Sequence, residues 1–498
     1  MRGILEDLER SAARFPDKTA VACGDERYSF AALKDAAQRL GAAVAARGLR
    51  AEPVGVFVNR SAETAVLFFA AAYSGNFYLP LDPAMPEKRL RAVIEDSGVR
   101  LLLGAEANRA AAESLGFADA FLTRTDAADR PCEAPEVTAD TPLYLVYTSG
   151  STGRPKGVLK SHGAMRSFLD AFTQTFPFGP DEIIGNQTPF FFDASAKDLY
   201  LSLRAGATLE IVPSRMFMLP TALIAYLNER RVSFICWVPT ALAMVVQMNA
   251  FRKLLPTTLR RVFFVGEPFP IKQLRQWAEA LPEIEYVNLL GSSELAGICC
   301  WYRVSPGARE EVLPVGRPLP NCRVFLRDGE ETVTEPGRTG ELCIVSPALA
   351  LGYYRDGEKT AACFREETLP DGTAARVFHS GDLARYDGEG NLVFVSRKDF
   401  QIKFKGERIE LGEIESAADA LESVQRCCCL YLAEKKQITL FCELRPGSEA
   451  DERAIRTALR EALPDYMLPQ RVALLERLPI NANGKIDRTA LYNAAASC

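Results

Sequence analysis

The residues best suited to chemistry form a short run of hydroxyls and glycines that ends in a lysine. The run follows an apolar, strand-like stretch and reads Thr148-Ser149-Gly150-Ser151-Thr152-Gly153-Arg154-Pro155-Lys156-Gly157. Glycines let backbone N–H groups approach an anion, hydroxyls donate hydrogen bonds, and a lysine supplies positive charge. The segment therefore predicts a phosphate-binding loop. It does not match GxGxxG. It also does not match GxxxxGK[ST], because a proline precedes the lysine.

The elements before Pro306 alternate between helical and strand-like patterns. A helix capped by Ser29 and ended by Gly48 has apolar residues at helical spacing, namely Phe30, Leu33, Ala37, Leu40 and Val44. We predict further helices at 63–73, 196–203, 221–230, 241–248 and 271–280. We predict strands at 54–58, 99–103, 143–147, 208–212, 234–237, 261–265 and 285–289. Strands and helices that alternate in this way predict parallel sheets covered on both faces.

The pattern changes after Pro306, where Gly and Pro become dense. Short predicted strands at 323–327, 340–345 and 391–395 indicate an antiparallel, barrel-like subdomain. A last segment begins near Asp399, with predicted helices at 413–421 and 451–463 and strands at 425–432 and 437–444. We therefore expect an α/β fold with a large domain at 1–398, made of two parallel α/β sheet subdomains and the barrel-like subdomain. A small α+β domain is expected at 399–498.

Composition excludes several classes of protein. The 498 residues carry a net charge of −5 and lack a basic run, which argues against nucleic-acid binding. The acidic start MRGILEDLERS argues against a signal peptide, and the longest apolar stretch, near 65–73, is too short to span a membrane. The 13 cysteines form no CxxC, and the histidines are His162 and His379. We therefore expect reduced, mostly buried thiols in a cytoplasmic protein, and no structural zinc site.

Several motifs in the expected order identify a family. With the phosphate loop they occur at 71–82, 192–195, 288–294, 340–344, 380–383, 397–403, 410–415, 463–469 and 483–488. This series resembles the adenylate-forming superfamily, which includes acyl-CoA ligases, luciferases and the adenylation domains of nonribosomal peptide synthetases. In length and layout the chain is most similar to stand-alone amino-acid-activating members such as D-alanine–carrier protein ligase.

The resemblance implies that a substrate carboxylate attacks the α-phosphate of ATP and expels pyrophosphate. Lys485 would bridge the carboxylate and the α-phosphate, Glu294 would bind Mg²⁺, and Asp382 with Arg397 would hold the ribose. Residues 148–153 and Lys156 would hold the other phosphates. The adenine would lie along Gly266, Glu267, Asn288, Leu289, Leu290, Gly291, Ser292 and Ser293. Most relatives have an aromatic residue in place of Leu290. Asp399 would be the hinge on which the C-terminal domain turns.

The resemblance places an amino-acid pocket at Asp193, whose carboxylate would pair with the substrate's α-ammonium group. Asp193 could instead cap the helix that follows it. The remaining pocket residues would be Ala194, Lys197, Cys236, Phe263, Val265, Leu289, Gly297 and Ile298. Lys197 could meet an acidic substrate side chain. It could equally pair with Asp198 or extend to solvent, in which case a small or medium apolar amino acid fits.

Three functions compete at this point. The first is an amino acid–carrier protein ligase. We expect its phosphopantetheinylated carrier to be a separate protein, because no carrier domain follows residue 488. We also expect this ligase to be a monomer. The second is an acyl- or aryl-CoA ligase, against which Asp193 counts. The third is an inactive homologue that only binds a partner, against which Lys485, Glu294, Asp382 and Lys156 count. Taken alone, Glu294 could be a solvated acid, and Asp382 with Arg397 a surface ion pair.

Overall fold

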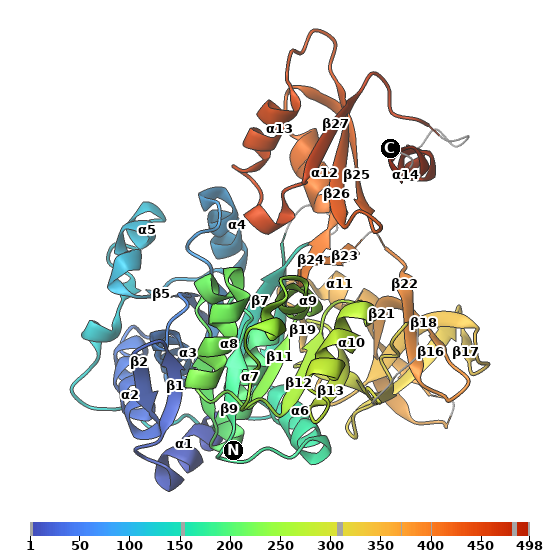
Figure 1. Cartoon of the computed structure of the whole chain (residues 1–498). Helices are drawn as coiled ribbons and strands as arrows, with labels where there is room; N and C mark the ends of the chain where they lie inside the picture. Colours follow the sequence, from blue (N-terminus) through green and yellow to red (C-terminus); the bar gives the residue numbers. More distant parts are fainter. Residues whose placement is uncertain are drawn as a thin grey trace. The chain divides into compact units, whose positions relative to one another are not determined.

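A computed structural model of the protein describes residues 3–150, 155–305, 312–369, 371–399, 401–480 and 486–496. The chain divides into two compact units (Figure 1). The larger unit consists of Met1–Pro83, Ser97–Val146 and Gly157–Lys398. The smaller unit consists of Ala84–Asp96, Tyr147–Lys156 and Asp399–Cys498. The start of the phosphate loop therefore belongs to the same unit as the C-terminal residues.

A nine-stranded sheet forms the first layer of the larger unit. Its strands are β1 (Thr19–Cys23), β2 (Glu26–Ser29), β9 (Ile183–Asn186), β10 (Thr208–Ile211), β11 (Phe234–Trp237), β12 (Arg261–Val265), β13 (Glu285–Gly291), β14 (Ile298–Arg303) and β15 (Arg317–Pro318). Their order is β15-β14-β13-β12-β11-β9-β10-β1-β2. The central strands are parallel, whereas β2, β14 and β15 run antiparallel to their neighbours.

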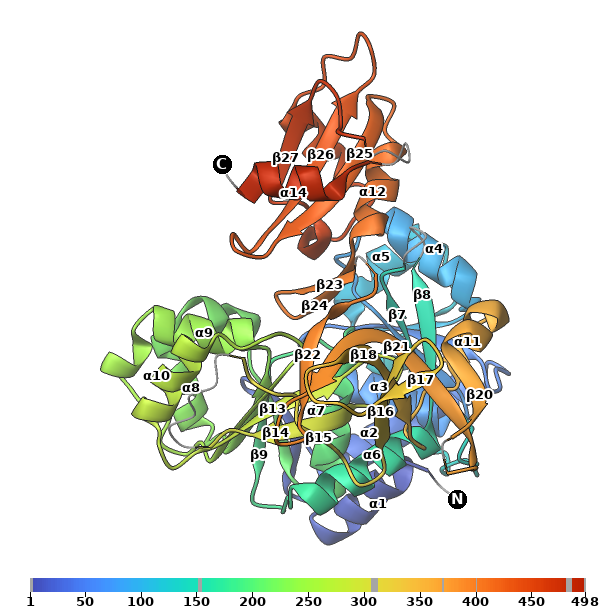
Figure 2. The same cartoon turned by 90° about the vertical axis from the view of Figure 1, so that its right-hand side faces the viewer.

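Helices cover both faces of this sheet (Figures 1 and 2). Helices α8 (Pro220–Glu229), α9 (Pro239–Gln247) and α10 (Ile271–Ala280) pack on one face, and α6 (His162–Thr175) and α7 (Ala194–Ala205) on the other. Successive side chains of a strand point to opposite faces. Ile235 and Trp237 accordingly join the core with α8–α10, whereas Phe234 and Cys236 join the core with α6 and α7.

A seven-stranded sheet forms the second layer. Its strands are β3 (Pro53–Phe57), β4 (Phe77–Leu81), β5 (Leu102–Leu103), β6 (Phe121–Leu122), β7 (Pro142–Thr148), β8 (Lys156–Ser161) and β19 (Gly352–Tyr353), in the order β19-β8-β7-β4-β3-β5-β6. The accompanying helices are α2 (Phe30–Ala45), α3 (Glu63–Tyr73), α4 (Glu87–Ser97) and α5 (Arg109–Ser114). Ser29 caps α2, because its side chain accepts a hydrogen bond from Ala32 N. The predicted helix with this cap is therefore confirmed.

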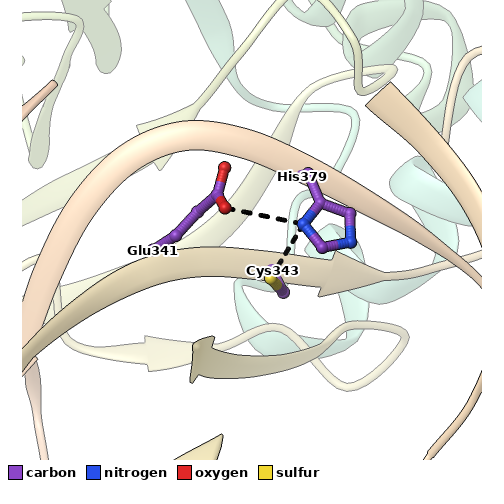
Figure 3. A group of neighbouring side chains, drawn as sticks. All are labelled: Glu341, Cys343 and His379. Carbon is purple, nitrogen blue, oxygen red and sulfur yellow. Dashed lines mark hydrogen bonds and ion pairs between the residues drawn. The ribbon is translucent and has the colours of Figure 1, made fainter. Parts of the chain in front are cut away.

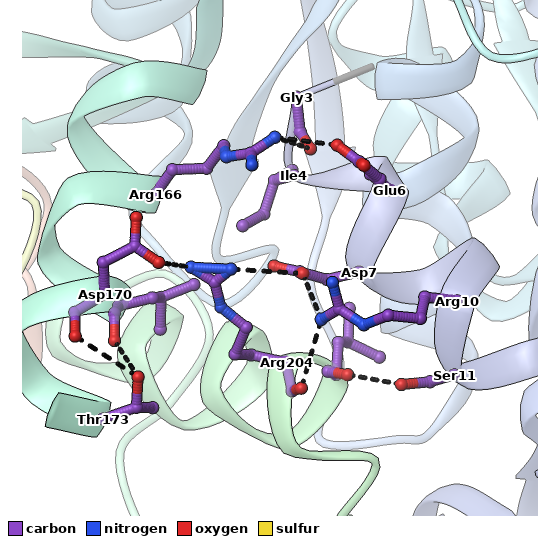
Figure 4. Close-up of polar contacts among 12 residues, drawn as sticks. Gly3, Ile4, Glu6, Asp7, Arg10, Ser11, Arg166, Asp170, Thr173 and Arg204 are labelled. Atoms are coloured by element: carbon purple, nitrogen blue, oxygen red, sulfur yellow. Dashed lines mark hydrogen bonds and ion pairs between the residues drawn. The ribbon is translucent and has the colours of Figure 1, made fainter. Parts of the chain in front are cut away.

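The N-terminal helix α1 (Leu5–Arg14) is held to α6 and α7 by polar contacts (Figure 4). Asp7 is buried and accepts hydrogen bonds from Arg10 and from Arg204, which also pairs with Asp170. Ser11 Oγ donates to the Leu203 carbonyl at 2.6 Å. Burial raises the pKa of the Asp7 carboxyl despite these arginines. Helix α7, which starts directly after Asp193, is thus fixed along its last turn.

An antiparallel sheet follows the two layers. It comprises β16 (Arg323–Asp328), β17 (Glu331–Val333), β18 (Thr339–Val345), β20 (Phe364–Thr368), β21 (Ala374–Tyr386) and β22 (Leu392–Arg397), with α11 (Gly357–Cys363) beside it. The order is β17-β16-β18-β21-β20, and β22 also pairs with β21. This curled sheet is the predicted barrel-like subdomain. The long strand β21 contacts three others and carries His379 and Asp382.

The smaller unit contains a three-stranded sheet, β25 (Val424–Leu432), β26 (Gln437–Leu444) and β27 (Arg471–Leu475). It also contains the hairpin β23 (Gln401–Phe404) and β24 (Glu407–Glu410), and the helices α12 (Leu411–Asp419), α13 (Glu452–Leu459) and α14 (Arg488–Ala496). Cys427 and Cys429 pack into the core with α12 and α13, whereas Cys428 packs toward α14. The twelve cysteines of the described residues are free thiols, and nine of them are buried.

Short 3-10 turns complete the secondary structure, at Glu106–Asn108, Arg124–Asp126, Ser214–Met218, Ala250–Arg252 and Asp465–Met467. The predicted fold class is confirmed, with one refinement. The two large sheets are mixed rather than purely parallel. In the nine-stranded sheet β2 and β14 run antiparallel to the strands that precede them, and in the seven-stranded sheet β19 runs antiparallel to β8. Within the described residues, no helix is both long and apolar enough to cross a membrane.

Candidate active site

Four residues predicted to line the substrate pocket lie on one face of the nine-stranded sheet. Cys236 and Phe263 are directly opposite each other on β11 and β12, and Val265 and Leu289 are opposite each other on β12 and β13. All four belong to the core that includes α7. Because strands alternate with period two, the parallel register brings these side chains to the face that α7 covers.

Lys197 and Asp198 form a buried ion pair on α7. Lys197 Nζ lies 2.7 Å from Asp198 Oδ1 and 3.4 Å from the Cys236 carbonyl oxygen, and Asn186 Nδ2 donates to Asp198 Oδ2 at 3.1 Å. Burial lowers the pKa of Lys197, but the Asp198 carboxylate outweighs it, so the net pKa is raised. The pairing that the sequence left open is therefore found. Extension of Lys197 to solvent is wrong, because the side chain is 5% exposed.

Asp193 lies at the start of α7 and is engaged by two side chains of the chain itself. Tyr144 Oη donates to Asp193 Oδ1 at 2.9 Å, and Lys160 Nζ pairs with the same oxygen at 2.5 Å. Asp193 makes no side-chain cap, so the alternative of a helix cap is wrong. The other oxygen, Oδ2, has no hydrogen-bond partner among the described residues. Burial raises the pKa of Asp193, although Lys160 opposes this.

Lys160 is the residue that sequence reasoning missed. It is fully buried, and its ammonium group also donates to the Leu295 carbonyl oxygen and lies 5.4 Å from the centre of the Tyr144 ring. The only signal in the sequence was a lysine within an apolar, strand-like stretch, Gly157-Val158-Leu159-Lys160. A buried ammonium group needs a counter-charge, and Asp193 supplies it.

A narrow cavity opens beside Asp193, toward the seven-stranded sheet. Tyr78, Tyr144 and Phe68 form a stack of aromatic rings along it. Its remaining lining residues are Pro80, Val146, Phe190, Phe192, Ser195, Ala196 and Leu199. Asp193 is the residue that this cavity shares with the predicted pocket.

Gly297 and Ile298 complete the predicted pocket and follow the turn after β13. A Cβ on Gly297 would lie 2.6 Å from the Phe168 ring, so any larger residue would displace that ring. Ile298 pairs with Gly291 across β13 and β14 and is 4% exposed. Ala194 is the first residue of α7.

The predicted adenine residues lie at the ends of β12 and β13. Gly266 follows β12 in the left-handed region at φ +101°, and Glu267 accepts a hydrogen bond from Thr240 Oγ1. Asn288 Nδ2 donates to the Pro314 carbonyl oxygen at 2.8 Å. Leu290 is 9% exposed. Carboxyl ends of adjacent parallel strands are the usual place for a ligand in such a sheet.

Two hydroxyl groups among the predicted nucleotide-binding residues are buried without a partner in the described residues. They are Ser292 Oγ, in the turn Gly291-Ser292-Ser293, and Thr148 Oγ1, at the end of β7. A buried hydroxyl that lacks a hydrogen bond is costly, by about 1–3 kcal/mol. Each of these hydroxyls would therefore gain a partner from a bound polar group such as a nucleotide.

Glu294, the predicted magnesium ligand, is buried rather than solvated, with 1% exposure. Tyr353 Oη donates to Glu294 Oε1 at 2.8 Å. Burial lowers the pKa of Lys160 and raises that of Asp193, and the Glu294 carboxylate makes a smaller contribution that acts to raise both. A single protein carboxylate of this type fits Mg²⁺, which takes its other ligands from water and phosphates.

Asp382 and Arg397, the residues predicted to hold the ribose, are paired with each other. They are opposite each other on β21 and β22, and Arg397 Nη1 donates to Asp382 Oδ1. The surface ion pair that the sequence left open is wrong, because their side chains are 9% and 12% exposed.

The described phosphate-loop residues lie in the smaller unit. Ser149 Oγ donates to the Arg408 carbonyl oxygen at 2.9 Å and accepts from Glu410 N at 3.2 Å. Gly150 N donates to Glu413 Oε2 at 3.3 Å, and Lys156 Nζ lies 3.7 Å from Glu410 Oε1. Glu413 also pairs with Arg89 on α4. The predicted residues Ser151, Thr152, Gly153 and Lys485 lie outside the described residues.

The unit boundary falls between Lys398 and Asp399, the predicted hinge residue. Asp399 is exposed, and its Oδ1 accepts a hydrogen bond from Gln401 N at 3.3 Å.

Known proteins share this fold and sequence. Residues 8–354 match the AMP-binding enzyme family, and residues 413–485 match the AMP-binding enzyme C-terminal domain. The phosphinothricin tripeptide synthetase PhsB of Streptomyces viridochromogenes is 35% identical, over 98% of this chain and 42% of that protein. Tyrocidine synthase 3 of Brevibacillus parabrevis is 31% identical, over 98% and 8%. The chain thus spans less than half the length of these relatives.

Solved structures agree. IdnL1 superposes with a TM-score of 0.82 at 31% identity, over 96% of this chain and 99% of that one. The Vibrio cholerae adenylation domain AlmE has a TM-score of 0.87 at 19% identity, over 99% and 98%, which concerns the fold alone. The chain therefore belongs to the AMP-binding enzyme family and, within it, to the adenylation domains of the nonribosomal peptide synthetase type.

Proposed function

We propose that the protein activates an amino acid with ATP as its aminoacyl-adenylate, releases pyrophosphate, and transfers the aminoacyl group to the thiol of a separate carrier protein. The observation that carries this proposal is the carboxylate of Asp193. Its Oδ1 is held by Tyr144 and Lys160, while Oδ2 has no partner in the described residues. A carboxylate oxygen that lacks a partner, on a residue that lines a cavity, suits a cationic group such as an α-ammonium.

Lys160 has a definite part in this arrangement. The buried pair fixes the orientation of Asp193, and the positive charge of Lys160 favours its ionised form. Tyr144 supports the same state, because its raised pKa keeps the phenol protonated and able to donate. The substrate would then meet a carboxylate that is already positioned by its partners, which lowers the cost of binding.

Several side chains are proposed to hold the nucleotide. Asp382 and Arg397 present a carboxylate and a guanidinium for the ribose hydroxyls, and the hydroxyls of Ser292 and Thr148 would gain the partners that they lack. Residues 148–153 and Lys156 would hold the phosphates. Glu294 would hold Mg²⁺, which spreads the charge that builds on the phosphoryl oxygens.

Lys485 is proposed as the lysine that contacts both the carboxylate and the α-phosphate. A compact ammonium on a flexible stem can follow negative charge as it shifts between those two groups. Asp399, at the boundary of the units, is proposed as the hinge that lets the smaller unit bring Lys485 in and later withdraw it.

The pocket favours a small or medium apolar amino acid over an acidic one. Lys197, the one cation predicted for the pocket, is already paired with Asp198, so an acidic side chain would have to compete with that carboxylate. The other predicted side chains are mostly apolar: Ala194, Cys236, Phe263, Val265, Leu289 and Ile298. AlmE, which shares the fold, was solved with glycyl-adenosine-5'-phosphate.

A second candidate function is an acyl- or aryl-acid ligase of the same family. One observation favours it: Lys160 already neutralises Asp193, so a substrate without an amine would leave no bare charge in the pocket. The two functions differ in whether Oδ2 of Asp193 is used.

ATP–pyrophosphate exchange tests the proposal. The purified protein is assayed with the twenty L-amino acids, D-alanine and their deaminated analogues. We expect exchange with one or a few apolar amino acids and none with the matching deaminated acids. Lys485→Ala should lower exchange roughly 100- to 1,000-fold, as loss of a charge-stabilising group does. Lys435→Ala, which removes an exposed lysine elsewhere in the smaller unit, is the control.

Asp193→Asn separates the two functions, with exposed Asp119→Asn as its control. If an amine binds Oδ2, exchange with the amino acid falls in Asp193→Asn and stays unchanged in the control. If the protein instead catalyses exchange only with deaminated acids, and Asp193→Asn retains this exchange, the protein is assigned as an acyl- or aryl-acid ligase. Transfer to a phosphopantetheinylated carrier rather than to free coenzyme A then tests the second half-reaction.

A further inference from the structure

A cluster of three metal-binding side chain types lies in the curled antiparallel sheet, outside the proposed active site. Cys343 on β18 and His379 on β21 are directly opposite each other in the register of the two strands. Glu341 lies two residues before Cys343, so both side chains point to the same face. Figure 3 shows the Glu341 carboxylate and the Cys343 sulfur turned toward the same ring nitrogen of His379.

Two distances within this cluster match those between ligands of one metal ion. His379 Nδ1 lies 3.6 Å from Cys343 Sγ and 3.5 Å from Glu341 Oε2. One donor atom from each residue lies within 4.8 Å of the others. Zinc bonds of about 2.0–2.3 Å in tetrahedral geometry place ligand atoms roughly 3.3–3.6 Å apart. The three donors are therefore already near the positions that such an ion requires.

The other side of the imidazole ring is held by a carboxylate. His379 Nε2 lies 2.6 Å from Glu367 Oε1, and Arg327 pairs with the second oxygen of Glu367 at 2.9 Å. When Nε2 carries the proton that this bond requires, the lone pair of Nδ1 points toward Cys343 and Glu341. A histidine whose outer nitrogen donates to a carboxylate is the usual arrangement of a metal ligand, because the carboxylate fixes the ring and raises its basicity.

We propose that Cys343, His379 and Glu341 bind a divalent transition-metal ion of the zinc class. A thiolate and an imidazole favour zinc or cobalt over magnesium or calcium, which prefer oxygen ligands. On binding, the Cys343 thiol releases its proton to solvent and its sulfur bonds to the metal, with His379 Nδ1 and Glu341 Oε2 as the other protein ligands. Water takes the fourth position. No step of the proposed adenylation reaction depends on this site.

Lys398 competes for the same carboxylate oxygen. Its Nζ lies 2.9 Å from Glu341 Oε2, and its side chain is 51% exposed. A divalent ion next to this ammonium is repelled by it, so Lys398 must move toward solvent when the ion binds. The exposed side chain can do so, because nothing buries its charge. Removing this charge should therefore strengthen ion binding, an effect that a misfolded variant would not produce.

Titration with Co²⁺ alone and Zn²⁺ alone tests the site. The whole protein is titrated with Co²⁺ while absorbance is followed, because a cobalt–thiolate bond gives a charge-transfer band in the near ultraviolet and tetrahedral cobalt gives visible bands. Zn²⁺ is then added in competition. We expect one Co²⁺ per chain with a thiolate band, displaced by Zn²⁺.

Four variants decide the assignment. Cys343→Ser should abolish the thiolate band, and His379→Gln should weaken Co²⁺ binding about 10- to 100-fold or more. The control Cys363→Ser removes a free cysteine of neighbouring α11 and should change neither the band nor the affinity. Lys398→Gln should tighten binding several-fold, with exposed Lys272→Gln as its matched control. The proposal is overturned if the thiolate band persists in Cys343→Ser, or if the unmodified protein binds Co²⁺ no more strongly than Cys343→Ser does. His379 would then be only an ion-pair partner of the two glutamates.

Discussion

The buried pair between Lys160 and Asp193 gives the sharpest prediction from this structure. Lys160 is fully buried, and Asp193 Oδ1 is its carboxylate partner. Replacing Lys160 by Met keeps a similar length but removes the charge, which leaves the carboxylate with Tyr144 as its only hydrogen-bond donor in the described residues. Breaking a buried pair from one side costs about 3–5 kcal/mol. We expect a loss of this size for Lys160→Met.

The loss should depend on pH in a defined direction. Without Lys160, burial raises the folded-state pKa of Asp193 still further above its value of about 3.9 in an unfolded chain. An acid with a raised pKa destabilises the fold at pH values above that pKa, because its charged form is the one that burial disfavours. The deficit of Lys160→Met should therefore be full near pH 8 and shrink toward pH 4, where Asp193 can be protonated.

A double-mutant cycle with Asp193→Asn isolates the pair. Calorimetric unfolding of the whole chain should show the transition of the larger unit shifted down by roughly 4–6 °C in Lys160→Met. The double variant should lose less than the two single variants together, by at least about 2 kcal/mol, because it leaves no uncompensated charge. If Lys160→Met costs under about 1 kcal/mol, or if the losses add, the pair is not the source of stability inferred here.

Three other perturbations follow from the described geometry. His162 is buried, its Nδ1 accepts a hydrogen bond from Ile4 N at 3.2 Å, and burial lowers its pKa from 6.5 to about 4. Because burial favours the neutral imidazole, up to roughly 3 kcal/mol of folding stability should be lost as the pH falls from 6.5 to 4. His162→Gln should flatten this pH dependence in acid unfolding measurements. Arg397→Ala should raise KM for ATP about 10- to 100-fold in the exchange assay, since a charged hydrogen bond contributes about 1.5–3 kcal/mol; an unchanged KM would refute a ribose role for the Asp382–Arg397 pair. Ser29→Ala should lower the unfolding free energy by about 1 kcal/mol through loss of the α2 cap, measured by urea unfolding beside Ser29→Asn, which should retain most of it.

Much of the fold could be predicted because local patterns decided it. The strands at 234–237 and 261–265 and the helix at 271–280 were predicted with the bounds that β11, β12 and α10 have. Their apolar periods are unambiguous and their ends are marked by turn residues. The strand predicted at 99–103 is shorter, at Leu102–Leu103, since only these two residues pair with neighbours. Helix α6 was missed, because His162-Gly163 at its start is typical of a loop.

The site was harder to predict, because its chemistry depends on pairs that are distant in sequence. No spacing rule connects Lys160 to Asp193, since their contact arises from packing of α7 beside the seven-stranded sheet. The sequence has only two histidines and no CxxC spacing, which argues against a structural zinc site. Sequence spacing could not reveal that strand register sets Cys343 opposite His379. Family motifs supplied the predicted roles, and only the folded structure could show that Lys197 is paired with Asp198 rather than free for a substrate.

The edges of the two large sheets have a consequence for the behaviour of the protein at high concentration. The edge strands of the nine-stranded sheet are β2, which contains Glu26 and Arg27, and the two-residue β15, which contains Pro318. The edge strands of the seven-stranded sheet are the two-residue β6 and β19. Such short strands with charge and proline offer few unpaired backbone groups to another molecule. Two wide sheets with many buried apolar strands are thus protected from edge-to-edge aggregation by the brevity of their last strands.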